Sequence, residues 1–349
     1  MKLYTDAGWL DAQHVEEIAD RNGINFIAII GKRQIGKTYN VLTWMLDSNK
    51  RFVFMRRVKP ELEMLEKGLN SPFDKLKKYA GKVRLVKESE YSAKVVKVTT
   101  DENGNESLEQ IGLGCALGTV GRLRGFNGDQ YTDVVFDEFI PEEHLYKIRN
   151  EGTAFKSAHD TINGNRELEG RPCLRWWLLA NANDLDNSIL EALHITKIVE
   201  RMSLRGEEYY ISKERGVMII MPESKVVTEK RANTGLYRAI GLDDEYARMA
   251  LGNEFSFNDR TDVMTAPLQE FNPYLSIGKI TICLHKSNKT LYVVDRLRAT
   301  PRYKYGDSDT YIQQFNRKHS DVKRAYLNGR MFFNNMTVKN YFMHYAQLD

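Results

Sequence analysis

The sequence has little cysteine and no long hydrophobic run, and both absences narrow the class of protein. The three cysteines, Cys115, Cys173 and Cys283, are odd in number and widely spaced, which fits reduced thiols and gives no metal-site spacing. No run of about 18 or more apolar residues occurs, and the first residues, MKLYTD, lack the apolar core of a signal peptide. We therefore expect a cytoplasmic protein with no membrane partner.

Internal repeats and low-complexity segments are also missing, which argues against solenoid architectures. The 349 residues, with 42% hydrophobic and 28% charged residues, are ordinary globular composition and suffice for two domains. The charge is uneven. Residues 271–349 hold 13 Lys or Arg against 5 Asp or Glu, a net charge of +8, whereas the whole chain carries only +4. The pattern predicts a basic C-terminal module attached to a slightly acidic body.

A phosphate-binding loop follows the first predicted strand, in the stretch FIAIIGKRQIGKT at residues 26–38. The segment from Gly31 to Thr38 fits G-x-x-x-x-G-K-[ST] and lies between an apolar strand and a helical pattern, as the mechanism requires. Lys37 is expected at the β- and γ-phosphates and the Thr38 hydroxyl on Mg²⁺. The residues predicted to bind the nucleotide are Gly31, Lys32, Arg33, Gln34, Ile35, Gly36, Lys37 and Thr38.

An acidic pair ends a second apolar strand at residues 131–140, YTDVVFDEFI. Ligands bind at the carboxyl ends of strands in open α/β sheets, so Asp137 and Glu138 are expected at the nucleotide. Asp137 is predicted to hold Mg²⁺ and Glu138 to act as general base toward the attacking water. The Asp-Glu pair, about 100 residues after a phosphate loop, favours an ATPase over a GTPase.

Polar groups elsewhere are candidates for sensing and for catalysis across a subunit interface. Asn181 ends the strand 174–180 and is either a γ-phosphate sensor or the cap of a turn. Arg166, in DTINGNRE at residues 160–167, is the first candidate for an arginine acting on a neighbouring subunit, and Arg171 is the second. Arg122 and Arg124, in the loop GRLRGFNG, either touch a phosphate or a neighbour or belong to a flexible connector.

Two further arginines, Arg56 and Arg57, end the predicted strand 51–55, which we place beside the phosphate-loop strand. They are suited to bind a nucleotide or backbone phosphate, but a solvated basic loop turned by Pro60 explains them equally well.

The remaining patterns predict the rest of the framework. A helix is expected at residues 11–22, short strands at 82–99 and 112–120 with a hairpin turn at 101–105, and a strand ribbon over 198–221. Residues 276–284 and 290–295 are expected to form a second hairpin. Basic and aromatic residues then interleave over 296–318, which suits contact with phosphates of nucleic acid, although a solvated basic face over an aromatic core gives a similar pattern.

Taken together, these motifs resemble the DNA-packaging motor ATPases of φ29-like bacteriophages. The resemblance rests on GKRQIGKT, FVFMRRVKPEL, VVFDEFI, D-T-x-x-x-N-R-E and ANA in this order, and on a Y-x-x-M-x-L-x-N-x-F pattern at residues 246–255. It implies a P-loop NTPase of the RecA- and FtsK-like, additional-strand catalytic-glutamate class, with a mostly parallel α/β sheet and helices on both faces. The expected domains are the ATPase at 1–222, a small linker subdomain at 223–256 and a basic α+β domain at 257–349 that resembles a degenerate ribonuclease-H-like nuclease.

The resemblance also implies a function and partners. It implies a homo-oligomeric ring, a pentamer, that hydrolyses ATP with Mg²⁺ and drives double-stranded DNA into a procapsid through the portal, in the host cytoplasm; a structural RNA is an open question. Family roles carry over to Lys37, Thr38, Asp137, Glu138 and Asn181. The family pattern can have an arginine where this chain has Gly164, so the trans-acting arginine is open.

Other functions on the same core are a terminase that also cuts DNA and a helicase or plasmid-partition ATPase. The strand Ile280-Thr281-Ile282-Cys283, taken as the first of the nuclease-like domain, has no central Asp, and only Asp295 ends the next strand. Because two-metal hydrolysis needs a cluster of carboxylates, the sequence disfavours an active nuclease.

Overall fold

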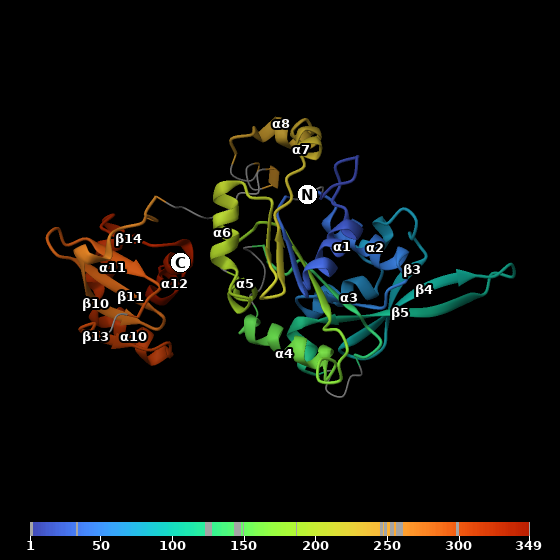
Figure 1. Ribbon diagram of the computed structural model, residues 1–349, viewed down its shortest axis with the longest axis horizontal. Helices are drawn as coiled ribbons and strands as arrows, with labels where there is room; N and C mark the ends of the chain where they lie inside the picture. Colours follow the sequence, from blue (N-terminus) through green and yellow to red (C-terminus); the bar gives the residue numbers. More distant parts are fainter. Residues whose placement is uncertain are drawn as a thin grey trace. The chain divides into compact units, whose positions relative to one another are not determined.

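The chain divides into two compact units in the computed structural model, Met1–Ser256 and Phe257–Asp349 (Figure 1). The structure describes residues 3–32, 34–122, 128–142, 148, 150–185, 187–244, 247, 250, 251, 255, 261–297 and 300–348, without the side chain of Lys225. A separate linker subdomain at 223–256 stays a prediction, and its described helices α7 (Lys225–Ala232) and α8 (Gly235–Ile240) belong to the first unit. Among the described helices, none is both long and apolar enough to span a membrane.

A nine-stranded sheet forms the centre of the first unit, in the order β3-β4-β5-β2-β6-β7-β1-β9-β8. The strands β5, β2, β6, β7, β1 and β9 run parallel, whereas β3, β4 and β8 pair antiparallel at the two ends. The mostly parallel sheet expected from the sequence is therefore confirmed. The strands are β1 (Phe26–Ile30), β2 (Phe52–Arg56), β3 (Val83–Lys87), β4 (Ser92–Thr100), β5 (Glu106–Ala116), β6 (Asp133–Asp137), β7 (Arg175–Ala180), β8 (Tyr209–Ser212) and β9 (Val217–Ile220).

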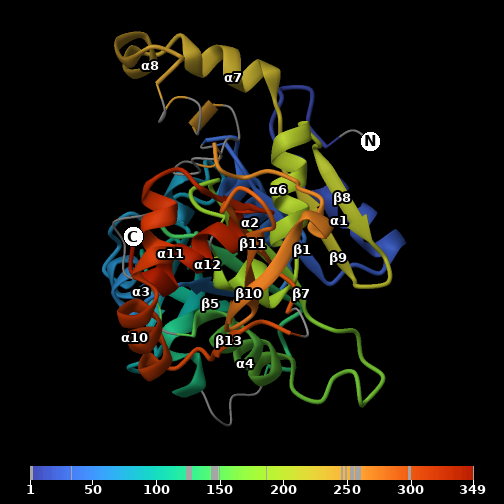
Figure 2. The same ribbon diagram turned by 90° about the vertical axis from the view of Figure 1, so that its left-hand side faces the viewer.

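Helices cover both faces of this sheet (Figure 1, Figure 2). Because alternate residues of a strand point to opposite faces, Ile27 and Ile29 pack in one hydrophobic cluster and Ala28 and Ile30 in the other. The first cluster includes residues of α1 (Ala12–Asn22), α2 (Lys37–Asp47) and α3 (Lys59–Glu66), with the short helix η1 (Pro72–Lys75). The second includes residues of η2 (Leu117–Arg122), α4 (Glu151–Asn163), α5 (Ser188–Ala192) and α6 (Thr196–Arg205).

The strand order decides which side chains meet at the carboxyl edge. Strand β7 lies between β1, which leads into the phosphate loop, and β6, which ends in Asp137. Strand β2 pairs with β6 and β5. The expectation that β2 neighbours the phosphate-loop strand was therefore wrong, and Arg56 at its end lies next to the acidic pair instead.

Two predicted strands proved to be helical. Residues 117–120 lie in η2, and Val199 to Leu204 lie in α6 rather than in a ribbon. The buried residues Val199 and Met202 are three positions apart, which places both on one face of a helix. The hairpin around 101–105 is confirmed: the Asp101 carboxylate accepts the backbone N–H groups of Asn103 and Asn105 at the tip of the projecting β4–β5 ribbon (Figure 1).

The second unit has a five-stranded sheet in the order β13-β10-β11-β12-β14. The predicted hairpin is confirmed as β11 and β12, which pair antiparallel. The first strand, however, is β10, so Ile280–Cys283 lies in the second strand; β10 reads FNPYLSI and also lacks Asp. The elements are η3 (Leu268–Glu270), β10 (Phe271–Ile277), β11 (Ile280–His285), β12 (Leu291–Val294), β13 (Tyr303–Tyr305), α10 (Asp309–Lys318), α11 (Ser320–Leu327), β14 (Met331–Phe333) and α12 (Met336–Ala346).

Candidate active site

The phosphate loop joins β1 to α2 through backbone turns that need positive φ. Gly31, Gln34 and Gly36 have φ values of 152°, 58° and 85°. Gly36 is the N-cap of α2 and supplies no side-chain cap, so the first N–H groups of this helix are left for another acceptor. A helix N-terminus of this kind favours a phosphate. The side chains of Lys32 and Ile35 are buried, and Arg33 lies outside the described residues.

The Lys37 side chain is turned back onto its own loop. Its Nζ donates to the carbonyl oxygens of Gly31 (2.9 Å) and Lys32 (2.6 Å) and to Oδ1 of Asn181 (3.0 Å). These three acceptors are neutral, and the side chain is buried. A lysine beside an uncapped helix end suits a phosphate, because the anion would be a charged acceptor for both the ammonium group and the free N–H groups.

Thr38 and Asp137 provide oxygen atoms next to that lysine. The Thr38 hydroxyl donates to Asp137 Oδ1 at 2.7 Å, which joins the start of α2 to the end of β6. Burial raises the pKa of the Asp137 carboxyl, while the positive charge of Arg56 opposes this rise. A hydroxyl and a carboxylate are oxygen ligands of the kind that Mg²⁺ takes beside phosphates, so these residues fit the ion expected from the sequence.

Glu138 follows Asp137 but points differently. Its backbone is in the left-handed region, with φ of 57°, and its side chain is 58% exposed. Non-glycine residues adopt this conformation at a cost, and such strain concentrates at functional sites. The turn separates the two neighbouring carboxylates, so that one is buried and the other faces solvent.

Arg56 ties the two carboxylates together, which the sequence did not predict. Its Nη1 donates to Asp137 Oδ2 at 3.0 Å and its Nη2 donates to Glu138 Oε2, while Nε contacts Glu61 at 3.3 Å. Burial alone would lower the pKa of Arg56, but Asp137, Glu138 and Glu61 raise it above its usual value. The neighbouring Arg57 is buried and pairs with Glu151 at 2.8 Å.

Two adjoining cavities open over these groups. One, of about 370 Å³, has Lys37, Thr38, Asp137, Glu138 and Asn181 in its lining. The other, of about 400 Å³, shares Thr38, Asp137 and Glu138 and extends to Arg56 and Glu61. The structure therefore brings the predicted lysine, threonine, carboxylates and amide together at one edge of the sheet.

Arg166 differs in its surroundings from Arg171 and Arg122, two other candidates for the trans-acting arginine. It is buried, and its Nη2 donates to the carbonyl oxygens of Gly128 (2.9 Å), Asp129 (3.0 Å) and Tyr131. This geometry holds the segment before β6 and disfavours Arg166 as a group offered to a neighbouring subunit. Arg171 pairs with Asp129 (2.8 Å) and Glu169 (2.6 Å) at the surface.

Arg122, another of these arginines, is exposed and lies over the ring of Tyr91, with its guanidinium carbon 5.1 Å from the ring centre. Arg124 lies outside the described residues.

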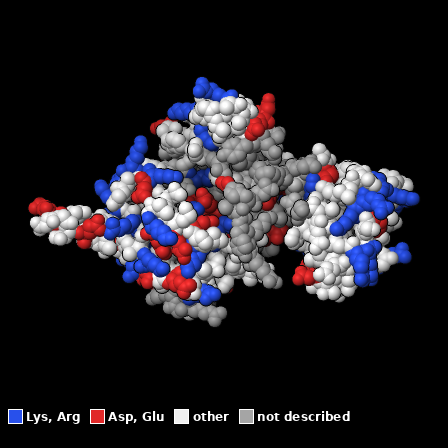
Figure 3. Space-filling view, turned by 180° about the vertical axis from the view of Figure 1, so that it is seen from behind, with Lys and Arg blue, Asp and Glu red and all other residues white. Residues whose placement is uncertain are grey.

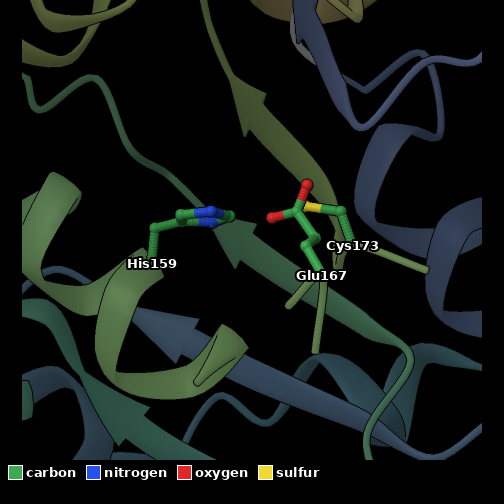
Figure 4. Close-up of side chains that lie close together, drawn as sticks. All are labelled: His159, Glu167 and Cys173. Carbon is green, nitrogen blue, oxygen red and sulfur yellow. The ribbon is translucent and has the colours of Figure 1, made fainter. Parts of the chain in front are cut away.

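A group of possible metal ligands lies away from this site. Ligand atoms of His159, Glu167 and Cys173 lie within 4.8 Å of one another (Figure 4). However, the Trp176 indole donates to His159 Nδ1 at 3.0 Å, so the neutral ring carries its proton on Nε2. Burial raises the pKa of the Cys173 thiol to about 11, so without a metal ion its sulfur is protonated. We assign no metal ion to this cluster.

The strand order and the loop at the edge of the sheet together define a P-loop fold in which one additional strand, β7, lies between β1 and β6. Comparison with solved structures is more specific. The chain is similar to the bacteriophage phi29 viral genome packaging motor assembly (TM-score 0.64, 17% identity, 99% of both chains) and to the phi28 gp11 DNA packaging motor (TM-score 0.60, 16% identity, 98% of both chains).

The resemblance seen in the sequence is thus confirmed at the level of the fold, over nearly the whole chain. No family model matches the chain, and no curated protein matches it.

Proposed function

We propose that this chain is a subunit of a ring-shaped motor that hydrolyses ATP with Mg²⁺ and drives double-stranded DNA into a viral procapsid. The observation that carries the proposal is the convergence of Lys37, Thr38, Asp137, Glu138 and Asn181 in one cavity. The similarity in fold to phage packaging motors supports the choice of DNA packaging among the functions of P-loop ATPases.

Nucleotide binding starts from the contacts of Lys37. Its Nζ exchanges two carbonyls and the Asn181 amide oxygen for phosphate oxygens, a change from neutral to charged acceptors. Thr38 and Asp137 would hold Mg²⁺, which neutralises charge that develops on the phosphates. The release of Asn181 from Lys37 makes its carboxamide available to the γ-phosphate or to the attacking water, which links binding to the edge of β7.

Hydrolysis requires Glu138 to accept a proton from water. In this structure Arg56 Nη2 donates a hydrogen bond to Glu138 Oε2, and this bond must break before Glu138 acts as a base. Phosphates entering the cavity would compete for the guanidinium, because Arg binds phosphate at least as well as carboxylate. Catalysis is thereby held back until the nucleotide is in place.

The ring arrangement rests on the exposure of the site. Glu138 is 58% exposed, and an oligomeric neighbour would both cover it and supply a further arginine. Of the arginines proposed for that role, Arg122 and Arg171 are at the surface. The portal as docking point, the pentameric state and a structural RNA remain parts of the proposal that come from the family resemblance alone.

Contact with DNA is proposed for the second unit. Lys and Arg side chains gather on its face in Figure 3, and β13 presents Tyr303, 36% exposed, with Arg302 over its ring at 5.3 Å and Lys304 beside it. Such basic and aromatic groups suit sequence-independent contact with phosphates. In the described part of this unit no three metal-binding side chains come together, so the cutting function of a terminase is not proposed.

The test is steady-state ATP hydrolysis with and without double-stranded DNA, over a range of protein and salt concentrations. We expect duplex DNA to stimulate turnover, the stimulation to rise cooperatively with protein, and salt to weaken it. Hydrolysis that ignores both DNA and protein concentration would contradict the motor and leave a self-contained ATPase.

A further inference from the structure

A third cavity adjoins the phosphate site, and it is lined by aromatic side chains. It has a volume of about 470 Å³ and a lining of Trp9, Gln34, Gly36, Tyr39, Asn40 and Lys77. Gln34, Gly36 and Tyr39 also line the cavity that contains Lys37 and Thr38. The two spaces therefore lie next to each other at the phosphate loop and the start of α2.

Trp9 lies against the second glycine of the phosphate loop. A β-carbon built on Gly36 would be 3.4 Å from Cε3 of Trp9, which is ordinary van der Waals contact. Gly36 is also the N-cap of α2, and Tyr39 is in the first turn of that helix. The two aromatic residues thus come from distant parts of the chain to the place where the loop becomes the helix.

The position of Trp9 is fixed although its ring is exposed. The Thr5 N–H donates to the Trp9 carbonyl at 2.8 Å, and the Trp9 N–H donates to Thr5 Oγ1 at 3.3 Å. Leu3 and Leu10, on either side of this turn, are fully buried. Trp9 is nevertheless 41% exposed and Tyr39 37% exposed. The backbone at Trp9 is therefore fixed, and its exposed indole beside a polar loop offers a flat apolar surface that a planar ligand can cover.

We infer that this cavity holds the base of the bound nucleotide, stacked on Trp9 and flanked by Tyr39. The inference rests on the proposed function, because the phosphates must occupy the loop for the base to reach the cavity. A base has a π face that stacks on aromatic rings, and it is tethered to phosphates through the ribose. Of the groups in the phosphate site and its two adjoining cavities, these two aromatic side chains are the only ones with exposed rings among the described lining residues.

Asn40 adds a polar edge to this apolar space. Its Nδ2 donates to the Gly36 carbonyl at 2.9 Å, which fixes the carboxamide at the mouth of the cavity. Its Oδ1 accepts no hydrogen bond from the residues that the structure describes. This oxygen is an acceptor suited to the exocyclic amino group of adenine.

Tryptophan fluorescence tests the inference on the full chain, because the other indoles are sheltered. Of the four tryptophans, Trp176 and Trp177 are fully buried, and Trp44 is half-buried with its indole bonded to Glu16 at 2.7 Å. We expect ATP to change the emission and to protect Trp9 from quenching by acrylamide. Inorganic tripolyphosphate, which has the phosphates but no base, should bind without this protection.

Variants separate stacking from phosphate binding. Stacking of a base on an aromatic ring contributes enough that Trp9→Ala should weaken ATP binding by about 5- to 150-fold. The same variant should bind tripolyphosphate as wild type does, which also shows that its phosphate loop is folded. Trp9→Phe should recover most of the ATP affinity. Tyr209→Ala removes an equally exposed aromatic ring outside this lining and should change neither affinity.

The outcomes are distinct for the base site and for the proposed function. Equal weakening of ATP and tripolyphosphate in Trp9→Ala, or no weakening of either, would overturn the base site while leaving the phosphate loop intact. If wild-type protein bound neither ATP nor tripolyphosphate, the nucleotide site itself would be wrong.

Discussion

Asn181 Oδ1 accepts a hydrogen bond from Lys37 Nζ at 3.0 Å, so the end of β7 is joined directly to the phosphate loop. The two residues are 144 positions apart in the chain. The contact favours a sensor role for the amide, because any ligand that draws Lys37 away also frees Asn181. The two roles considered for Asn181, a γ-phosphate sensor and the cap of a turn, therefore predict different effects of substitution.

We predict different effects on ATP binding for two substitutions at Asn181. Asn181→Asp places a carboxylate on Lys37, and the resulting ion pair should compete with phosphates and weaken ATP binding about tenfold or more. Asn181→Ala removes one neutral acceptor of Lys37 and should leave ATP binding within about threefold while slowing hydrolysis. Calorimetric titration with ATP and turnover assays measure both. Equal ATP affinity in the two variants would show that Asn181 does not control the lysine.

Glu138→Gln should bind ATP as wild type does and hydrolyse it about 10² to 10⁴ times more slowly, since the amide accepts no proton from water. The control is Glu61→Gln, which removes another carboxylate that contacts Arg56, through Nε at 3.3 Å rather than through the nitrogen that binds Glu138. That variant should keep turnover within a few-fold. Wild-type hydrolysis by Glu138→Gln would remove Glu138 from its role as base.

The sequence predicted the central site because its signals are local. A glycine-rich loop between strand and helix, and an acidic pair after an apolar strand, each specify their own geometry, and the parallel sheet then brings Lys37 and Asp137 to one edge. The contact of Arg56 with Asp137 and Glu138 was missed because it depends on which strand lies beside β6. Strand order is set by packing of the whole sheet, and no local pattern near Arg56 encodes it.

The sequence predicted a strand where α6 lies, and this error has a similar cause. Val199 to Leu204 contains apolar residues that fit a short strand as well as a helix, and only its packing against the sheet decides. Arg166 was expected at the surface of a ring-forming ATPase, whereas its burial and its three carbonyl acceptors depend on the loop before β6.

His159 should make stability depend on pH. Burial lowers the pKa of its imidazole, and the Trp176 indole occupies Nδ1. Because the folded pKa lies below the unfolded one, the contribution of His159 to stability is complete above the unfolded pKa, about 6.5, and is lost as the pH falls through the folded pKa. Thermal unfolding of wild type and His159→Gln across mildly acidic pH should show a smaller loss in the variant. Parallel loss in both proteins would assign the effect to other groups.

Substitution of Arg166 should destabilise the protein, whereas substitution of a surface arginine that acts on a neighbouring subunit should not. Arg166→Leu leaves three carbonyl oxygens without their donor, at a cost of roughly 2 to 4 kcal/mol, and should lower the melting temperature clearly. Arg122→Ala removes an exposed guanidinium over Tyr91 and should leave the melting temperature nearly unchanged. A loss of ATPase activity in Arg122→Ala without loss of stability would then mark a functional arginine.

Mixing two inactive variants decides whether that arginine acts between subunits. In a ring of Arg122→Ala and Glu138→Gln chains, some interfaces pair an intact Glu138 with an intact Arg122 from the neighbour, so activity should return. If the arginine instead acts on its own subunit, each site in the mixed ring lacks either Arg122 or Glu138, and activity should not return. Arg171→Ala is tested in the same mixture, since Arg171 is also at the surface, where it pairs with Asp129 and Glu169. Recovery with neither arginine would exclude both as the group that completes the site of the neighbouring subunit.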